Sequence, residues 1–204
     1  MNFNFDSIIF DLGGVILNID YHKTITAFKN LGILNFEELY TQAKQNHIFD
    51  RFEKGLLSPK KFRQYINQHS SVKLSDEKID SAWNAMLLDL PQKRIQLLEQ
   101  LKTSKHIFLF SNTNAIHLKA FRQNIKKQYG NELLLENIFN KTYYSHLIGK
   151  RKPNADGFIQ IIEENGLIPE KTLFIDDSPQ HIEGAKKVGL QTLWLKDTDI
   201  VSVF

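Results

Sequence analysis

The sequence predicts an α/β fold, with a doubly wound, Rossmann-like parallel sheet as the core and an inserted helical cap. Short apolar runs rich in β-branched and aromatic residues alternate with helical patterns along most of the 204 residues. Such alternation is typical of parallel sheets with right-handed crossovers. From about residue 21 to residue 88 the alternation stops, and several helical patterns follow one another without a convincing strand. We therefore expect a core of residues 1–20 and 89–204 and a cap of residues 21–88.

Four apolar runs are predicted to be buried parallel strands, because each is short and rich in β-branched and aromatic residues. They are SIIFDL (7–12), HIFLFSN (106–112), TLFIDDS (172–178) and LQTLWLK (190–196). KTYYSH, residues 141–146, is a weaker candidate for a fifth strand.

Helical patterns fill the intervals between these runs. Residues 91–104 begin near a proline and then place apolar residues on one helical face: Ile95, Leu97, Leu98 and Leu101. In the expected cap, Ser58 precedes a proline and Ser75 precedes two acidic residues. Both serines have the pattern of helix N-caps.

The composition excludes several classes of function. The net charge is only +3, from 26 basic and 23 acidic residues, which does not indicate a nucleic-acid or membrane partner. The chain has no cysteine, so disulfides, thiolate metal sites and cysteine nucleophiles are excluded. Residues 1–17 have no basic leader, and Asp6 and Asp11 interrupt their apolar stretch. We therefore expect neither a signal peptide nor a membrane span, and a cytoplasmic protein.

Polar residues end three of the predicted strands: Asp11, then Ser111 with Asn112, then Asp176 with Asp177. One aspartate after a strand is more often a turn former or a helix cap. Ligands, however, bind at the carboxyl ends of parallel strands, so these side chains should converge on one crevice. Two adjacent carboxylates at a buried strand end repel each other unless a cation holds them, which favours a hard metal such as Mg²⁺.

The basic segment GKRKPNADGF, residues 149–158, supplies one more candidate. A residue before proline has an extended backbone, and a helix is predicted to begin near Asn154, so Lys152 should lie beside the same crevice. The alternative is a solvated basic loop. At least one of Lys150, Arg151 and Lys152 is expected to be only solvated.

In order and spacing, four segments resemble the four motifs of the haloacid dehalogenase-like (HAD) hydrolase superfamily. They are FDLGGV at Asp11, FLFSNTN at Ser111, GKRKP at Lys152 and FIDDSPQHIEGA at Asp176. Each motif is weak alone, but four in order over the whole chain are specific. Their details resemble the sugar-phosphatase branch that includes the bacterial α-D-glucose-1-phosphate phosphatases. In that family the helical insertion is a cap that closes over the active site and selects the substrate.

The resemblance implies a phosphomonoester hydrolase that uses Mg²⁺. By this resemblance Asp11 is the nucleophile, which attacks phosphorus to form an aspartyl-phosphate that water hydrolyses. The metal ligands would be Asp11, the main-chain carbonyl of Gly13 and Asp176. Asp177 would be an indirect ligand, because successive side chains at a strand end point to opposite sides.

The phosphate group also has expected partners. Ser111 and the backbone N–H of Asn112 would bind its oxygens, and Lys152 would neutralise charge on the nucleophile and the transferring group. The expected partner is a small phosphorylated metabolite, with neither nucleic acid nor membrane, and the expected state is a monomer or weak dimer.

Gly13 departs from the superfamily pattern, in which a second aspartate at this position is the general acid. Such acids contribute about 10²- to 10⁴-fold to the rate. Two alternatives stay open: a weakened, phosphosugar-binding protein, or a phosphatase whose leaving groups need little protonation. The anomeric hydroxyl is more acidic than an ordinary alcohol, which favours sugar 1-phosphates. His22 or a metal-bound water are other donors, although His22 is more simply the polar start of the first cap helix.

Four further residues have weaker signals. Glu53 and Gly55 lie where this branch has a cap loop that faces the substrate, although a helix-end glycine explains Gly55 equally well. His117 and His181 are expected on helices near the crevice, but not as metal ligands, because Mg²⁺ prefers oxygen. A haloacid dehalogenase would share the nucleophile of this site but uses no metal, which the motif DDSP argues against. A receiver domain is excluded by motif order and chain length.

Overall fold

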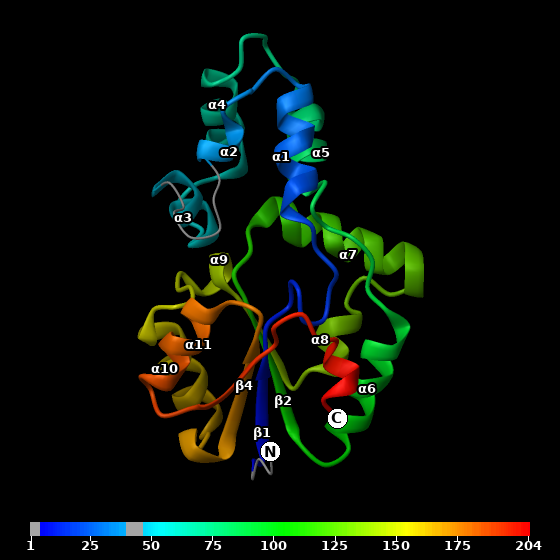
Figure 1. The fold of residues 1–204 in the computed structure, drawn as a ribbon, viewed down its shortest axis with the longest axis vertical. Coiled ribbons are helices and arrows are strands. Elements are labelled where there is room, and N and C mark those ends of the chain that lie inside the picture. Colours follow the sequence, from blue (N-terminus) through cyan, green and yellow to red (C-terminus); the bar gives the residue numbers. More distant parts are fainter. Residues whose placement is uncertain (1–4, 40–46) are drawn as a thin grey trace.

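The computed structural model describes residues 5–39 and 47–204. Its centre is a parallel five-stranded sheet in the order β3-β2-β1-β4-β5. The strands are β1 (Ser7–Phe10), β2 (His106–Ser111), β3 (Lys141–Tyr144), β4 (Thr172–Asp176) and β5 (Gln191–Trp194). The predicted α/β class is therefore confirmed, and the weaker strand candidate is present. Because β1 is central, the residue that follows it emerges in the middle of the carboxyl edge (Figure 1).

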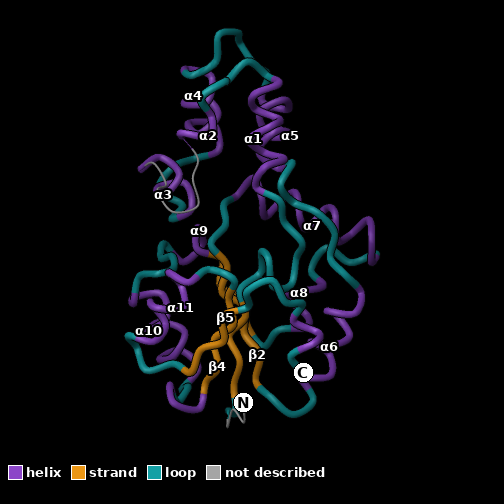
Figure 2. Tube along the Cα trace, viewed as in Figure 1, coloured by secondary structure: helices purple, strands orange, loops and turns teal. Residues whose placement is uncertain are grey.

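Helices cover both faces of the sheet (Figure 2). One face carries α6 (Gln92–Lys102), α7 (Ala115–Tyr129) and α8 (Leu134–Ile138), and the other carries α10 (Ala155–Asn165) and α11 (Pro179–Lys186). Short elements complete this part of the chain: α9 (Ser145–Ile148), η1 (Pro169–Lys171) and η2 (Ile200–Ser202). No described helix has both the length and the apolar character needed to cross a membrane.

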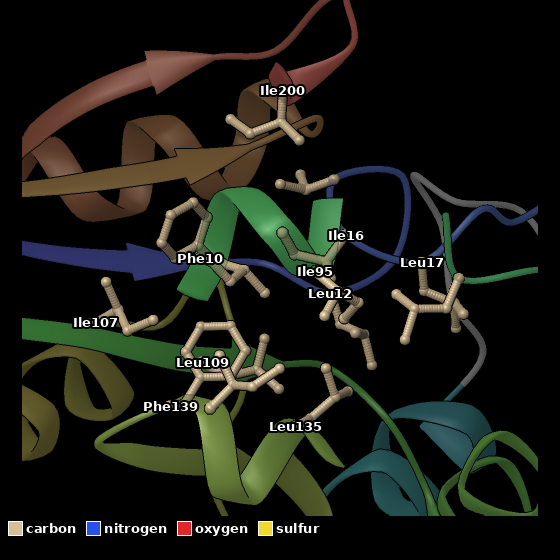
Figure 3. Close-up of a cluster of buried hydrophobic side chains, with 14 of the residues drawn as sticks. Phe10, Leu12, Ile16, Leu17, Ile95, Ile107, Leu109, Leu135, Phe139 and Ile200 are labelled. Atoms are coloured by element: carbon tan, nitrogen blue, oxygen red, sulfur yellow. The ribbon is translucent and has the colours of Figure 1, made fainter. Parts of the chain in front are cut away.

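The alternation of side chains along β1 divides the core into two layers. Ile8 and Phe10 belong to the apolar cluster under α6, α7 and α8, part of which Figure 3 shows around Phe10 and Leu109. Ile9 belongs to the cluster on the opposite face, together with Phe158 of α10. A strand buried on both faces needs a continuous apolar run, and SIIF provides one.

In the part of the chain that the structure describes, five helices, α1 to α5, lie beyond the carboxyl ends of the strands (Figure 1). They are α1 (Tyr21–Asn30), α2 (Phe36–Leu39), α3 (His47–Glu53), α4 (Pro59–Gln68) and α5 (Asp76–Asn84). Aromatic side chains fill their interior, and the rings of Phe52 and Phe62 stack at 4.3 Å. The predicted N-caps are present, because the hydroxyls of Ser58 and Ser75 each accept a hydrogen bond from the first turn of α4 and α5.

We propose that these five helices are a cap unit, joined to the core near residues 20 and 89. The two connecting segments lie side by side and are paired through their backbones. Asn18 donates to the carbonyl of Asp89 at 3.0 Å and accepts from Leu88 at 3.0 Å, and Asp20 donates to the carbonyl of Met86 at 2.9 Å. These hydrogen bonds hold the two connecting segments together and fix the position of the residues that follow, where α1 begins.

Candidate active site

The carboxyl ends of the three middle strands meet in one place. Asp11 directly follows β1, and Ser111 and Asp176 are the last residues of β2 and β4. Their exposed fractions are only 8%, 3% and 0%. A cavity opens in front of them, and five of the predicted site residues line it: Asp11, Gly13, Ser111, Asn112 and Asp177.

The ammonium of Lys152 lies inside the protein, between two of these carboxylates. Its Nζ donates to Oδ1 of Asp11 at 2.6 Å and to Oδ2 of Asp176 at 2.7 Å. It also lies 5.6 Å and 5.4 Å from the ring centroids of Phe110 and Phe174, distances typical of cation–π contacts. The side chain is fully buried, and α10 begins three residues later.

The side chain of Asn112 holds this lysine in place. Its Oδ1 accepts from the backbone N–H of Lys152, and its Nδ2 donates to the backbone carbonyl of Lys152, both at 2.9 Å. Sequence analysis assigned only the backbone of Asn112 to the phosphate and missed this role. The two residues are 40 positions apart, and no local pattern indicates the pairing.

Both carboxylate oxygens of Asp176 accept hydrogen bonds from protein groups. The backbone N–H of Ser178 donates to Oδ1 at 2.8 Å. Nδ1 of His181 lies 3.0 Å from Oδ1 and 2.9 Å from Oδ2. His181 is thus a hydrogen-bond partner of a carboxylate, an arrangement typical of groups that orient a metal ligand.

His117 also lines the cavity, but both of its ring nitrogens form hydrogen bonds where cap and core meet. Its Nε2 donates to the carbonyl of Trp83 at 3.1 Å, and its Nδ1 accepts from Nδ2 of Asn114 at 3.1 Å. Burial lowers the pKa of His117 to about 4, so the imidazole is neutral at pH 7. Neither ring nitrogen is placed to bind a metal at the carboxylates.

The electrostatics of the site show a shortage of positive charge. Burial, together with the charges of Asp11 and Asp176, raises the pKa of Asp177 to about 7. Burial and Asp176 likewise raise the pKa of Asp11, against the opposing effect of Lys152. Although burial works against ionisation of Asp176, Lys152 and His181 lower its pKa to about 2.

A divalent cation fits this donor set. Potential ligand oxygens of Asp11, Asp176 and Asp177 lie within 4.8 Å of one another, and carboxylate oxygens are the ligands that Mg²⁺ prefers. Among the described residues, the buried ammonium of Lys152 pairs with two of the three carboxylates, those of Asp11 and Asp176. A bound cation would therefore relieve the repulsion that raises the pKa values of two of them.

Asp177 reaches the same cluster as Asp176. The expectation that the two would point apart was based on strand alternation, but β4 ends at Asp176, so the pleat does not extend to its neighbour. Gly14 makes room for the Asp177 carboxylate. Gly14 has a φ of +78°, and a Cβ there would lie 2.2 Å from Oδ2 of Asp177. The second glycine of FDLGGV is therefore required by both backbone conformation and space.

Gly13 lines the cavity, and an apolar side chain fills the space beside it. A Cβ at Gly13 would lie 2.9 Å from Cδ1 of Ile19. The surrounding cavity wall is apolar as well: Leu17, Ile19, Met86 and Leu87. An acid at position 13 would therefore need Ile19 to move.

Cap and core are connected beside the cavity by an arginine. Nε of Arg151 lies 3.0 Å from Oε2 of Glu53 in an ion pair, and Nη1 of Arg151 donates to Asp50. The side chains of Arg151 and Glu53 are exposed by only 15% and 13%, and both residues line the cavity. Sequence analysis expected at least one of Lys150, Arg151 and Lys152 to be only solvated and assigned no role to Arg151. Whether Glu53 faces the substrate, as the resemblance implies, stays a prediction.

Gly55 has a role beyond ending α3. Its φ is +68°, and a Cβ there would lie 2.2 Å from the carbonyl oxygen of His146 in the core. The glycine thus allows both the left-handed turn and the close approach of cap and core.

In the first turn of α1, the adjacent residues Tyr21 and His22 face different surroundings. The side chain of His22 is exposed, and its backbone N–H donates to the N-cap Asp20 at 2.9 Å. His22 is absent from the described residues that line the cavity, whereas Tyr21 is one of them. Sequence analysis considered His22 and overlooked Tyr21, because a single helical turn does not reveal which residue faces inward.

Comparisons with known proteins agree with this geometry. A model of haloacid dehalogenase-like hydrolases matches residues 5–189. D-ribitol-5-phosphate phosphatase from Bacteroides thetaiotaomicron is 30% identical over 186 residues, 91% of this chain and 89% of that protein. An aspartate-to-alanine variant of a HAD family enzyme from the same organism, in complex with magnesium and inorganic phosphate, has a TM-score of 0.91. It is 34% identical and matches over 98% of each chain. A predicted HAD-like family hydrolase from Porphyromonas gingivalis has a TM-score of 0.87 at 29% identity, over 98% of this chain and 96% of that one.

The matches extend over core and cap alike, since each structure covers nearly the whole chain. They do not confirm the finer resemblance to glucose-1-phosphate phosphatases, because the named relative at 30% identity is a phosphatase of a sugar-alcohol phosphate. They do confirm the superfamily that the four motifs indicate: the chain belongs to the haloacid dehalogenase-like hydrolases.

Proposed function

We propose that this protein is a Mg²⁺-dependent phosphatase of small phosphorylated sugars or sugar alcohols. The observation that carries the proposal is the buried cluster in which Lys152 joins Asp11 and Asp176 at 2.6 and 2.7 Å, at the edge of a cavity. Relatives support it, because one is named a ribitol-phosphate phosphatase and another was crystallised with magnesium and phosphate.

In the proposed reaction, an oxygen of Asp11 forms a bond to phosphorus while the bond from phosphorus to the ester oxygen breaks. The departing ester oxygen takes up a proton and becomes the hydroxyl group of the released alcohol. Water then attacks phosphorus, loses a proton and releases inorganic phosphate, which restores the carboxylate of Asp11. The protein has to hold the nucleophile in line, and the hydrogen bond from Lys152 does this for Asp11.

The remaining residues have proposed binding roles. The hydroxyl of Ser111 and the backbone N–H of Asn112 bind phosphate oxygens at the ends of β2 and its loop. Asp11, Asp176, Asp177 and the carbonyl of Gly13 would hold the cation. When bound, Mg²⁺ supplies charge neutralisation at the phosphate and among the carboxylates.

Two kinds of leaving group have independent support. Gly13 provides no acid, which favours sugar 1-phosphates, because the anomeric oxygen leaves with little protonation. The ribitol-5-phosphate phosphatase at 30% identity favours a primary alcohol as the leaving group.

The test is a kinetic comparison of D-ribitol 5-phosphate, glucose 1-phosphate and glucose 6-phosphate, each with Mg²⁺ and with a chelator. Turnover should require Mg²⁺, and Asp11→Asn should abolish it, by about 10⁴-fold or more, while the variant still folds because Asp176 remains as a charged partner of Lys152. Turnover by Asp11→Asn would contradict the aspartyl-phosphate. Mg²⁺-dependent binding of these esters without turnover would support the phosphosugar-binding alternative instead.

A further inference from the structure

The leaving oxygen requires a proton unless the leaving group is unusually acidic, and this inference rests on the proposed phosphatase function. The usual donor position is Gly13, and the space beside that residue is filled by Ile19. A side-chain donor for an ordinary alcohol would therefore stand on another wall of the cavity. The cap side supplies the candidate.

Tyr21 is the first residue of α1 and lines the same cavity as Asp11. Its place is set at the junction of cap and core. Asp20, directly before it, donates its backbone N–H to Met86 at 2.9 Å and caps α1 through its side chain. The phenol is thus carried by the cap but held close to the core by the paired connecting segments.

The surroundings of the Tyr21 hydroxyl keep it protonated. Burial raises its pKa, and the negative charges of Asp177, Asp11 and Glu53 raise it further. Tyr21 lines the same cavity as these three residues. At neutral pH it is therefore a hydrogen-bond donor in a region otherwise rich in acceptors.

Three other titratable side chains of the cavity are held by neighbouring groups. Both ring nitrogens of His117 bond to cap and core groups. Nδ1 of His181 is held by Asp176. Glu53 is ion-paired with Arg151.

We propose that the hydroxyl of Tyr21 is the proton donor to the leaving oxygen. As the bond from phosphorus to that oxygen breaks, the Tyr21 proton moves to the oxygen, and the neutral alcohol leaves. The resulting phenolate then takes a proton from the water that attacks the aspartyl-phosphate. Each turnover consumes one ester and one water, yields one alcohol and one phosphate, and returns Tyr21 to its starting state.

The raised pKa makes this phenol a weaker acid than the usual carboxyl group, but proton transfer to an alkoxide is still favourable. An alkoxide from a primary alcohol is a strong base, so even a phenol that holds its proton firmly transfers it as the bond breaks. A nitrophenolate needs no proton to leave. The contribution of Tyr21 should therefore depend on the leaving group, which a merely structural role would not.

The experiment compares wild type, Tyr21→Phe and the control Tyr144→Phe with two substrates, D-ribitol 5-phosphate and 4-nitrophenyl phosphate. Tyr144 is outside the cavity lining, and its hydroxyl donates to Glu136 at 2.9 Å. Tyr21→Phe should lower kcat/KM for ribitol 5-phosphate by about 10²- to 10³-fold and change that for the nitrophenyl ester by less than about 3-fold. The control should keep the wild-type ratio between the two substrates.

Equal losses with both substrates would show that Tyr21 only positions or binds, and would overturn the inference, as would no loss with either. Wild-type turnover of the nitrophenyl ester alone would also overturn it, because no donor would then serve an alkoxide. If wild type hydrolyses neither ester, the proposed function itself is wrong, and the role of Tyr21 falls with it.

Discussion

The ammonium of Lys152 donates to the carboxylate of Asp11 across 2.6 Å, although 141 positions separate the two residues in the chain. The same ammonium is shared with Asp176 at 2.7 Å, and its side chain is fully buried. A buried ammonium is stable only with such partners, and each carboxylate depends on the ammonium in turn. The cluster therefore couples the stability of the core to the chemistry of the site.

Lys152→Met should abolish turnover and destabilise the metal-free protein by about 3–5 kcal/mol, because it leaves buried carboxylates without their cation. Mg²⁺ should restore part of this loss, since it neutralises the same oxygens. Urea unfolding with Mg²⁺ and with a chelator measures both effects. The stabilisation by Mg²⁺ should be larger in the variant than in the wild type, and an equal or smaller one would contradict a shared role of lysine and metal.

Gly14→Ala should weaken Mg²⁺ binding, because the new Cβ would lie 2.2 Å from Oδ2 of Asp177. Gly130→Ala is the matched control. Gly130 has a similar φ, +76° against +78°, and an added Cβ there meets nothing within 4 Å. Both variants should lose about 1–2 kcal/mol of stability from backbone strain. Calorimetric titration with Mg²⁺ should show weaker binding in Gly14→Ala alone, and equal affinities in the two variants would exclude the steric effect on Asp177.

Arg151→Met should loosen the cap, because it removes a cation that pairs with both Glu53 and Asp50 across the interface. Arg63→Met is the control, since Arg63 pairs with Asp80 at 2.7 Å entirely within the cap. Loss of Arg151 should raise KM for a polyol phosphate by about 10-fold, as a lost charge-assisted contact of about 1.5 kcal/mol would do. Loss of Arg63 should lower stability but leave KM unchanged. A rise of KM in both variants would mean that general weakening of the cap is the cause.

The pH dependence of stability should report Asp177. In the metal-free protein its pKa is raised from 3.8 to about 7, so the folded state binds the proton more tightly than the unfolded state. Its stabilising contribution is thus complete below the unfolded value of 3.8, declines as pH rises toward about 7, and changes no further above that.

The measurement is the free energy of unfolding across this range, with a chelator present, for wild type and Asp177→Asn. The decline in the free energy of unfolding that Asp177 causes as pH rises should be absent from the variant, because an amide does not titrate. Adding Mg²⁺ should reverse the trend in the wild type, because the cation binds the ionised carboxylate. Parallel curves for the two proteins would show that Asp177 is not the titrating group.

The sequence by itself determined the sheet and the place of the site. Apolar runs such as SIIF and TLFID can only be buried between two layers of helices, and parallel strands present all their carboxyl ends at one edge. That is why Asp11, Ser111 and Asp176 were predictable as neighbours. These are consequences of local periodicity and of connection rules, which act along the chain.

Tertiary structure alone decided how the rest of the site is assembled. No sequence pattern predicts three of its contacts. Asn112 forms hydrogen bonds with the backbone of Lys152, Arg151 pairs with Glu53, and Ile19 fills the space beside Gly13.

Tertiary structure also decides which of two adjacent residues faces the site. Tyr21 and His22 stand side by side at a helix start, and the docking of α1 onto the cap interior through Phe28 turns one inward and leaves the other exposed. Periodicity specifies that a helix has a buried face, but which distant groups meet there depends on how whole elements pack, because those contacts form only when cap and core are together.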